Sequence, residues 1–165
     1  EEWLSFGAKY KSRTIYKQDL NRSREKLENG IYFDSGTGRG RGVEINVTDK
    51  FGNSLLHKVL AKELIHKKFG THLAPKEATN NYGELLAFCY ATEIALKERV
   101  PKVFGDSELV IKYWSKRRRK KERLPETTVK LISKAYRLRL RYDKSGGKVL
   151  YISGDINPAD LGFHK

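Results

Sequence analysis

The stretch Ile31-Tyr32-Phe33-Asp34-Ser35-Gly36-Thr37-Gly38 decides the fold of this chain, because a short apolar run ends on a carboxylate and then breaks into glycine. The apolar run is typical of a buried strand. Nothing in an ordinary core requires an acid directly after Ile-Tyr-Phe. We therefore expect the strand to deliver Asp34 to a functional site at its open end, where other acids join it.

The residues after this strand predict a small antiparallel sheet. Glycines 36, 38, 40 and 42 alternate with threonine and arginine, which indicates a flexible, basic hairpin whose backbone can approach phosphates. Val43, Ile45 and Val47 then alternate with polar residues, the pattern of a half-buried strand. We interpret residues 54–60 as a third strand. The short connections predict that the three strands form an antiparallel meander.

A helix is expected over residues 79–99, with Thr79 or Asn80 as its N-cap. This helix places Glu84 in its first or second turn. Residues 102–107 then repeat the opening design, with a brief apolar strand that ends on Asp106. Because a long helix connects this strand to the first one, we expect the two strands to pair in parallel.

The rest of the chain predicts three helices and one strand. A helix is expected from about Ser107, and a second from Pro125 with an apolar stripe (Leu131, Ala135, Leu138, Tyr142) beside a cationic one (Lys130, Lys134, Arg137, Arg141). Residues 148–153 are expected to form the last strand. Asn157-Pro158-Ala159-Asp160 has a capping asparagine with proline at the first helical position, which predicts a final short helix that carries Asp160 at its start.

The composition predicts one soluble domain that binds a polyanion. The 165 residues fit a single domain, and no apolar run is long enough to cross a bilayer, so we expect a cytoplasmic monomer. Residues 1–29 carry no sustained pattern and are interpreted as an N-terminal extension or linker before a domain at 30–165. The single Cys89 lies in an apolar helical pattern and predicts a small buried hydrophobe.

The charge is strongly basic, with 34 Lys and Arg against 20 Asp and Glu, a formal net charge of +14. Residues 116–121 hold six consecutive cations, and Arg137, Arg139 and Arg141 form a second cluster. Nucleic acid is the preferred partner. An anionic membrane surface is the alternative, and it is disfavoured because no strong apolar face accompanies the basic run.

Four acids stand at the ends of predicted elements: Asp34, Glu84, Asp106 and Asp160. Parallel pairing of the first and fourth strands would place Asp34 and Asp106 at one edge of the sheet. Four adjacent carboxylates repel one another, and divalent cations are their natural compensation. Oxygen-only ligation suits Mg²⁺ or Mn²⁺ rather than Zn²⁺. Taken singly, each acid could instead be a helix cap or a surface charge.

With these motifs the chain resembles the type 1 ribonuclease H family from about Gly30 to its end. Residues 31–37 resemble the family's first-strand motif, with Ser35 where many members have glycine. Thr79-Asn80-Asn81-Tyr82-Gly83-Glu84-Leu85-Leu86-Ala87 is the most specific match. Phe104-Gly105-Asp106-Ser107 and Asn157-Pro158-Ala159-Asp160-Leu161 resemble the motifs of the third and fourth acids.

The resemblance implies an α/β ribonuclease H-like fold, a five-stranded mixed sheet with three antiparallel and two parallel strands, flanked by helices. It implies an endonuclease that hydrolyses the RNA strand of RNA/DNA hybrids with two Mg²⁺ ions, or Mn²⁺ as substitute, and leaves 5′-phosphate and 3′-hydroxyl ends. The four acids would be both catalytic and metal-binding. Substrate would be bound by the following residues: Ser35, Gly36, Thr79, Asn80, Asn81, Arg117, Arg118, Arg119 and Lys120.

The chain departs from the family in one motif. Many members carry a histidine in a loop before the last helix, and residues 152–156 supply none, so either Asp155 substitutes for it or the step proceeds without a substitute. Two alternatives remain open. The chain could be a non-catalytic nucleic-acid-binding module with the same fold, or another nuclease of the superfamily, such as an integrase-like or junction-cutting enzyme.

Overall fold

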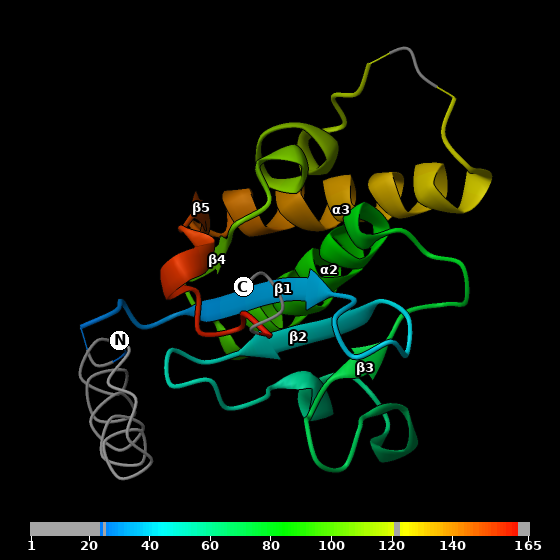
Figure 1. The fold of residues 1–165 in the computed structure, drawn as a ribbon. Coiled ribbons are helices and arrows are strands. Elements are labelled where there is room, and N and C mark those ends of the chain that lie inside the picture. The colour runs from blue at the N-terminus through cyan, green and yellow to red at the C-terminus, as the bar shows by residue number, and fades with distance from the viewer. Residues whose placement is uncertain (1–23, 25, 121–122, 162–165) are drawn as a thin grey trace, which may run out of the picture.

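The computed structural model describes residues 24, 26–120 and 123–161 (Figure 1). Its centre is a five-stranded sheet with the order β3-β2-β1-β4-β5. Strand β1 pairs antiparallel with β2, which pairs antiparallel with β3, while β1 with β4 and β4 with β5 pair in parallel. This confirms the predicted mixed sheet. The strand bounds are β1 (Ile31–Gly36), β2 (Glu44–Thr48), β3 (His72–Leu73), β4 (Lys102–Gly105) and β5 (Lys148–Tyr151).

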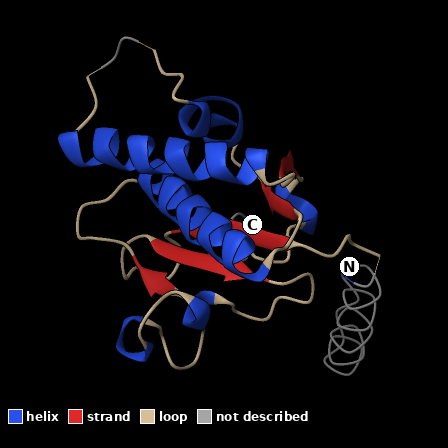
Figure 2. Cartoon of the chain, turned by 180° about the vertical axis from the view of Figure 1, so that it is seen from behind, coloured by secondary structure: helices blue, strands red, loops and turns tan. Residues whose placement is uncertain are grey.

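Two long helices cover one face of the sheet (Figure 2). Helix α2 (Asn80–Glu98) begins at the predicted cap Thr79, and α3 (Glu126–Lys144) begins directly after Pro125. The apolar stripe predicted for α3 is buried, and the predicted cationic stripe lies outside it. None of the helices in the described part of the chain is long and apolar enough to span a membrane.

The core lies on both sides of β1. Toward the helices, the Phe33 ring meets the Phe88 ring edge to face, with centroids 5.7 Å apart. On the opposite face, the Tyr32 and Phe104 rings stack with centroids 4.6 Å apart, and Ala159 packs against them. The C-terminal segment therefore crosses the face of the sheet that α2 and α3 leave open (Figure 1).

The prediction of a third strand at residues 54–60 is wrong. Ser54 forms a single bridge with Thr48, and Leu56–Lys58 is a 3₁₀ turn. Strand β3 is instead the dipeptide His72–Leu73, which pairs with the start of β2. The apolar residues of 54–60 do not alternate but cluster, and they pack together on the helix side of the core (Leu55, Leu56, Val59, Leu60). An extended strand would point these apolar side chains to both faces in turn, whereas the compact turn buries them together on one side.

Two of the predicted helices also differ from expectation. The helix expected near Ser107 is short and irregular, with a π-helical turn at Leu109–Tyr113 and a 3₁₀ turn at Trp114–Lys116. The helix expected from Pro158 is absent from the described residues, which end at 161. The Asn157 side chain accepts a hydrogen bond from the Ala159 N–H, and the Asp160 N–H binds the Asn157 carbonyl, so this segment is a turn.

Candidate metal centre

Three acids from three separate elements meet at one edge of the sheet. Asp34 lies in β1, Glu84 in the second turn of α2, and Asp106 directly after β4. Each offers a carboxylate oxygen, and these oxygens all lie within 4.8 Å of one another. Asp34 and Glu84 are buried, while Asp106 is half-buried. The cluster is therefore open to solvent on the Asp106 side.

Parallel pairing of β1 with β4 brings the two aspartates together. Tyr32 is in register with Phe104, and Phe33 with Gly105, so Asp34 and Asp106 follow at equivalent positions. Gly105 is required here because a Cβ at that position would lie 2.3 Å from the Phe33 ring. The carboxyl ends of parallel strands meet at one sheet edge, which is where open α/β sheets place their sites.

Close packing of α2 against the sheet delivers Glu84. A Cβ on the preceding residue, Gly83, would lie 2.3 Å from Val43 Cγ1 and 3.1 Å from Ser35 Cβ. The helix can approach this closely only because Gly83 has no side chain. The Ser35 hydroxyl also donates to Asn80 Oδ1 at 2.8 Å, which ties β1 to the first turn of α2.

Burial and nearby negative charge raise the pKa values of two of these acids, Asp34 and Glu84. Burial, followed by the nearby Glu84 carboxylate, raises the pKa of Asp34 to about 11. Burial also raises the pKa of Glu84 to about 8. The hydrogen bonds with the Asp34 side chain and the Ser35 backbone oppose this shift, and the charges of Asp106 and Asp160 add to it. The site therefore favours a positive charge placed among the three carboxyl groups.

Asp160 is not part of the three-acid cluster. Its charge is near enough to contribute to the raised pKa of Glu84, so it lies beside the site. Two buried asparagines hold the segment that carries it. Asn46 Nδ2 donates to the Ala159 carbonyl at 2.9 Å, and Asn157 Nδ2 donates to the Phe33 carbonyl at 3.1 Å and to Asp106 Oδ2 at 3.4 Å.

These two asparagines were not predicted from the sequence. The sequence pattern predicts Asn157 as a helix cap and places Asn46 among the polar residues of an alternating strand. No local sequence pattern distinguishes Asn46. Its pairing with Asp34 becomes visible only once the register of β1 with β2 is known.

The predicted substrate-binding residues fall into two groups. The side chain of Ser35 and the backbone of Gly36 are buried, so any effect of Ser35 on substrate would pass through Asn80. The other group is exposed. Its members are Thr79, Asn80 and Asn81 at the start of α2, and Arg117, Arg118, Arg119 and Lys120 in the basic run, whose last residue, Lys121, lies outside the described part.

Arg139 differs from Arg137 and Arg141, the other members of the second cationic cluster, because it is buried. Its Nη1 donates to the Ile111 carbonyl at 3.0 Å and to the Ser115 hydroxyl at 2.8 Å, and its Nε pairs with Asp143 at 3.2 Å. Arg139 thus holds the irregular helix between Asp106 and the basic run. The interpretation of Arg139 as part of a surface cation cluster is wrong.

The loop 152–156, in which the family histidine is missing, lies against the three-acid cluster. A Cβ on Gly154 would lie 3.0 Å from Asp106 Oδ2, so this loop passes close to the acid. The next residue, Asp155, is exposed. Its suggested role as a substitute for the histidine stays a prediction.

The donor set fits a hard divalent cation. The three clustered side chains offer carboxylate oxygen only, which suits Mg²⁺ or Mn²⁺. Glu84 Oε1 is buried and has no hydrogen-bond partner among the residues that the structure describes. A buried acceptor of this kind is costly without a partner, and a bound cation would supply one.

No family model and no curated protein matches the sequence. The similar solved structures include the N-terminal RNase H domain of a Mycobacterium tuberculosis protein, fused to maltose-binding protein. It is 20% identical, with a TM-score of 0.44, and the match covers 79% of this chain and 86% of that one.

Two further structures are similar at the same level. The RNase H1 from the halophilic archaeon Halobacterium salinarum is 20% identical, with a TM-score of 0.38 and coverage of 76% of this chain and 83% of that one. An RNase H1 isolated from compost by a metagenomic approach is 21% identical, with a TM-score of 0.41 and coverage of 76% and 82%. The ribonuclease H-like fold of this chain is defined by its own strand order and pairing.

Proposed function

We propose that this chain is an endonuclease of the ribonuclease H type, which hydrolyses the RNA strand of RNA/DNA hybrids and leaves 5′-phosphate and 3′-hydroxyl ends. The proposal rests on one observation. Asp34, Glu84 and Asp106, delivered by β1, α2 and β4, offer carboxylate oxygens within 4.8 Å of one another at the open edge of the sheet. A stable core would not assemble three acids in this way, because their burial and repulsion are unfavourable.

The acids would hold two Mg²⁺ ions, for which Mn²⁺ could substitute. Asp34, Glu84 and Asp106 would bind them from the sheet and α2, and Asp160 would add its carboxylate from the C-terminal segment. When bound, such ions lower the pKa of an attacking water and neutralise charge on the scissile phosphate and the leaving oxygen. The chain itself needs no nucleophile for this reaction.

Residues around the acids would position the substrate. Thr79 accepts a hydrogen bond from the Tyr82 N–H and caps α2, which leaves Asn80 and Asn81 exposed beside Glu84. An asparagine amide both donates and accepts hydrogen bonds, as contact with a 2′-hydroxyl requires. The exposed cations at 116–120 would bind phosphates of the same duplex, with affinity gained from counterion release.

Cleavage of labelled RNA/DNA hybrid, double-stranded RNA and double-stranded DNA in Mg²⁺ tests the proposal. We expect cleavage of the RNA strand of the hybrid only, and loss of activity in Asp106→Asn. Asp49→Asn is the matched control, because Asp49 caps the turn at the opposite end of β2 and should not affect cleavage. Hybrid binding without cleavage would indicate a non-catalytic module, and cleavage of double-stranded DNA would indicate another nuclease class.

A further inference from the structure

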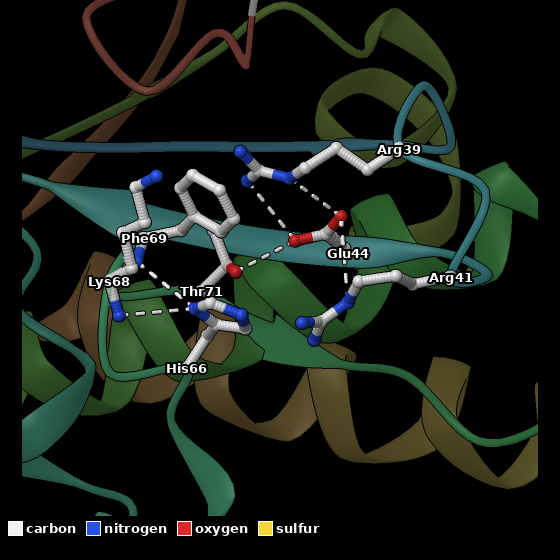
Figure 3. Close-up of polar contacts among 7 residues, drawn as sticks. All are labelled: Arg39, Arg41, Glu44, His66, Lys68, Phe69 and Thr71. Atoms are coloured by element: carbon white, nitrogen blue, oxygen red, sulfur yellow. Dashed lines mark hydrogen bonds and ion pairs between the residues drawn. The ribbon is translucent and has the colours of Figure 1, made fainter.

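A fully buried carboxylate lies outside the metal centre, on Glu44 of β2. Arg39 donates to it with both Nε, at 2.9 Å, and Nη2, at 3.1 Å, and the Thr71 hydroxyl donates at 2.8 Å (Figure 3). Arg41 Nε lies 3.9 Å away. Burial alone would raise the pKa of Glu44, but the hydrogen bonds from Arg39 and Thr71 hold it below its usual value. Glu44 is therefore a charged anchor for two arginines.

An aromatic side chain holds Arg39 from a second direction. The Arg39 guanidinium carbon lies 3.5 Å from the centroid of the Phe69 ring, and the His66 ring stacks on Phe69 with centroids 4.5 Å apart (Figure 3). His66 Nδ1 accepts hydrogen bonds from the backbone N–H groups of Lys68 and Phe69, which closes the loop 66–71 on itself. Arg39 is thus fixed between Glu44 and a folded loop.

These contacts order a segment that the sequence makes flexible. Arg39 and Arg41 belong to the hairpin 37–42, in which Gly40 and Gly42 have positive φ angles. A buried ion pair rarely gains net stability over apolar packing, because both charges lose their hydration. The burial of the Glu44 charge is therefore better explained by its role in fixing one conformation of the glycine-rich hairpin than by a gain in core stability.

The hairpin stands next to the metal centre. Glu44 is in register with Gly36, two residues beyond Asp34 on the same strand. The Arg39 and Arg41 side chains remain 24% and 34% exposed, and Lys67 and Lys68 of the neighbouring loop are exposed. The hairpin connects β1 to β2 and therefore lies on the β2 and β3 side of β1 (Figure 1). The basic run 116–120 follows β4, which lies on the other side of β1 in the sheet.

We propose that the hairpin 37–42 and the loop 66–71 form a preassembled phosphate-binding surface for the nucleic-acid backbone on the β3 side of the acids. This inference rests on the proposed function, since it assumes a nucleic-acid substrate. Arg39 and Arg41 contact phosphate, and Glu44 is a positioning residue that sets the direction of their guanidinium groups. A duplex across the acids then contacts cations on both sides of the cleavage position.

Glu44→Gln gives the sharpest test, because two explanations predict opposite signs. The substitution removes a negative charge and raises the formal net charge from +14 by one unit. If Glu44 acted only through its contribution to the net charge of the protein, the variant would bind nucleic acid more tightly. Because Glu44 positions the arginines, we expect binding of a labelled RNA/DNA hybrid in EDTA to weaken at least about threefold. Equal or tighter binding would overturn the proposal.

Arginine variants provide the second test, and they leave the Glu44 carboxylate itself in place. Arg41→Ala should weaken hybrid binding by about tenfold and reduce the slope of log affinity against log salt by about one. Arg39→Lys keeps the charge but loses the two-pronged contact, so its affinity should fall with little change in slope. Lys148→Ala, at the far end of β5, removes one exposed cation as the matched control and should change neither quantity.

Binding in EDTA and cleavage in Mg²⁺ separate the two proposals. If wild-type protein fails to cleave hybrid while its affinity depends on Arg41 and Glu44, the nuclease function is wrong and this surface is retained. If wild-type protein cleaves hybrid and the arginine variants bind as wild type does, this surface is wrong and the nuclease function stands. Thermal unfolding of each variant confirms that lost binding does not come from lost folding.

Discussion

Asn46 donates a hydrogen bond to the backbone carbonyl of Ala159, at 2.9 Å and across 113 residues of sequence. The bond joins β2, directly beside Asp34, to the residue before Asp160. Asn157 adds a second connection three residues before Asp160, through its hydrogen bonds to Phe33 and Asp106. The position of Asp160 is therefore set by amide side chains rather than by a helix.

Removing this connection should weaken the metal centre as well as the fold. We expect Asn46→Ala to lower the free energy of unfolding by about 1 to 3 kcal/mol, because the Ala159 carbonyl is left buried without its donor. It should also raise the Mg²⁺ concentration needed for half-maximal hybrid cleavage, because Asp160 is no longer held. Denaturant unfolding and a Mg²⁺ titration of the cleavage rate measure the two effects.

Asn53→Ala is the matched control for this prediction. Asn53 lies in the exposed turn after β2 and contacts Asp49, away from the acids. It should leave the Mg²⁺ requirement unchanged. An Asn46→Ala protein that is less stable but has a wild-type Mg²⁺ requirement would show that Asn46 has a structural role only.

The raised pKa values of Asp34 and Glu84 predict how stability depends on pH without metal. A folded-state pKa of about 11 for Asp34, against 3.8 in the unfolded chain, means that the folded protein retains a proton that the unfolded chain releases. The contribution of Asp34 to stability is therefore complete below about pH 4 and decreases as pH rises toward 11. The contribution of Glu84 to stability likewise decreases as pH rises from 4.5 to about 8.

Asp34→Asn should consequently stabilise the metal-free protein at pH 7. We expect a gain of at least about 1.4 kcal/mol, the equivalent of one pKa unit, measured by denaturant unfolding in EDTA. Mg²⁺ should stabilise the wild-type protein and have little effect on the variant. Glu126→Gln, which removes an exposed carboxylate paired with Lys130, is the control and should change stability little. A destabilised Asp34→Asn protein would contradict the assigned protonation.

The acids could be predicted from the sequence because each follows a local signal. Asp34 and Asp106 each follow a short apolar run in the sequence, and Glu84 lies one turn after a cap, so short-range patterns locate all three. Asn46 and Asn157 could not be found in this way, because their partners Ala159 and Phe33 lie 113 and 124 residues away. A polar residue on an alternating strand looks the same whether it faces water or a distant carbonyl.

The errors in the fold also have physical causes. Strand β3 is two residues long, too short for any periodicity, while the apolar cluster at 54–60 resembles a strand and folds as a turn. Arg139 belongs to a run of alternating arginines, and its burial is decided by the carbonyl of Ile111, which α3 meets only after the chain has folded. In both places, contacts between distant segments determine the outcome.

Gly83 sets how closely α2 approaches the sheet, so its substitution should affect both stability and catalysis. Alanine has the higher helix propensity by about 1 kcal/mol, yet its Cβ would lie 2.3 Å from Val43 Cγ1. We expect Gly83→Ala to lower the free energy of unfolding by about 1 to 3 kcal/mol and to reduce hybrid cleavage through displacement of Glu84. Urea unfolding and the cleavage rate are the measurements.

A double variant separates steric crowding from other effects of Gly83. Val43→Ala removes the methyl group that the new Cβ would meet. In the Val43→Ala background, Gly83→Ala should therefore cost less stability than in the wild-type background. Equal costs in both backgrounds would show that the Val43 contact does not limit the approach of α2.

Arg139 and Arg137 are two residues apart on α3, and the structure predicts opposite consequences for them. Arg139→Ala removes the buried hydrogen bonds to the Ile111 carbonyl and the Ser115 hydroxyl, which still bond to each other, and should cost about 2 to 4 kcal/mol in the free energy of unfolding. Arg137→Ala removes an exposed cation and should change stability by less than about 0.5 kcal/mol. Because Arg139 holds the helix that leads into the basic run, Arg139→Lys should also weaken hybrid binding although its charge is kept. Equal stabilities for the two alanine variants would contradict the assigned role of Arg139.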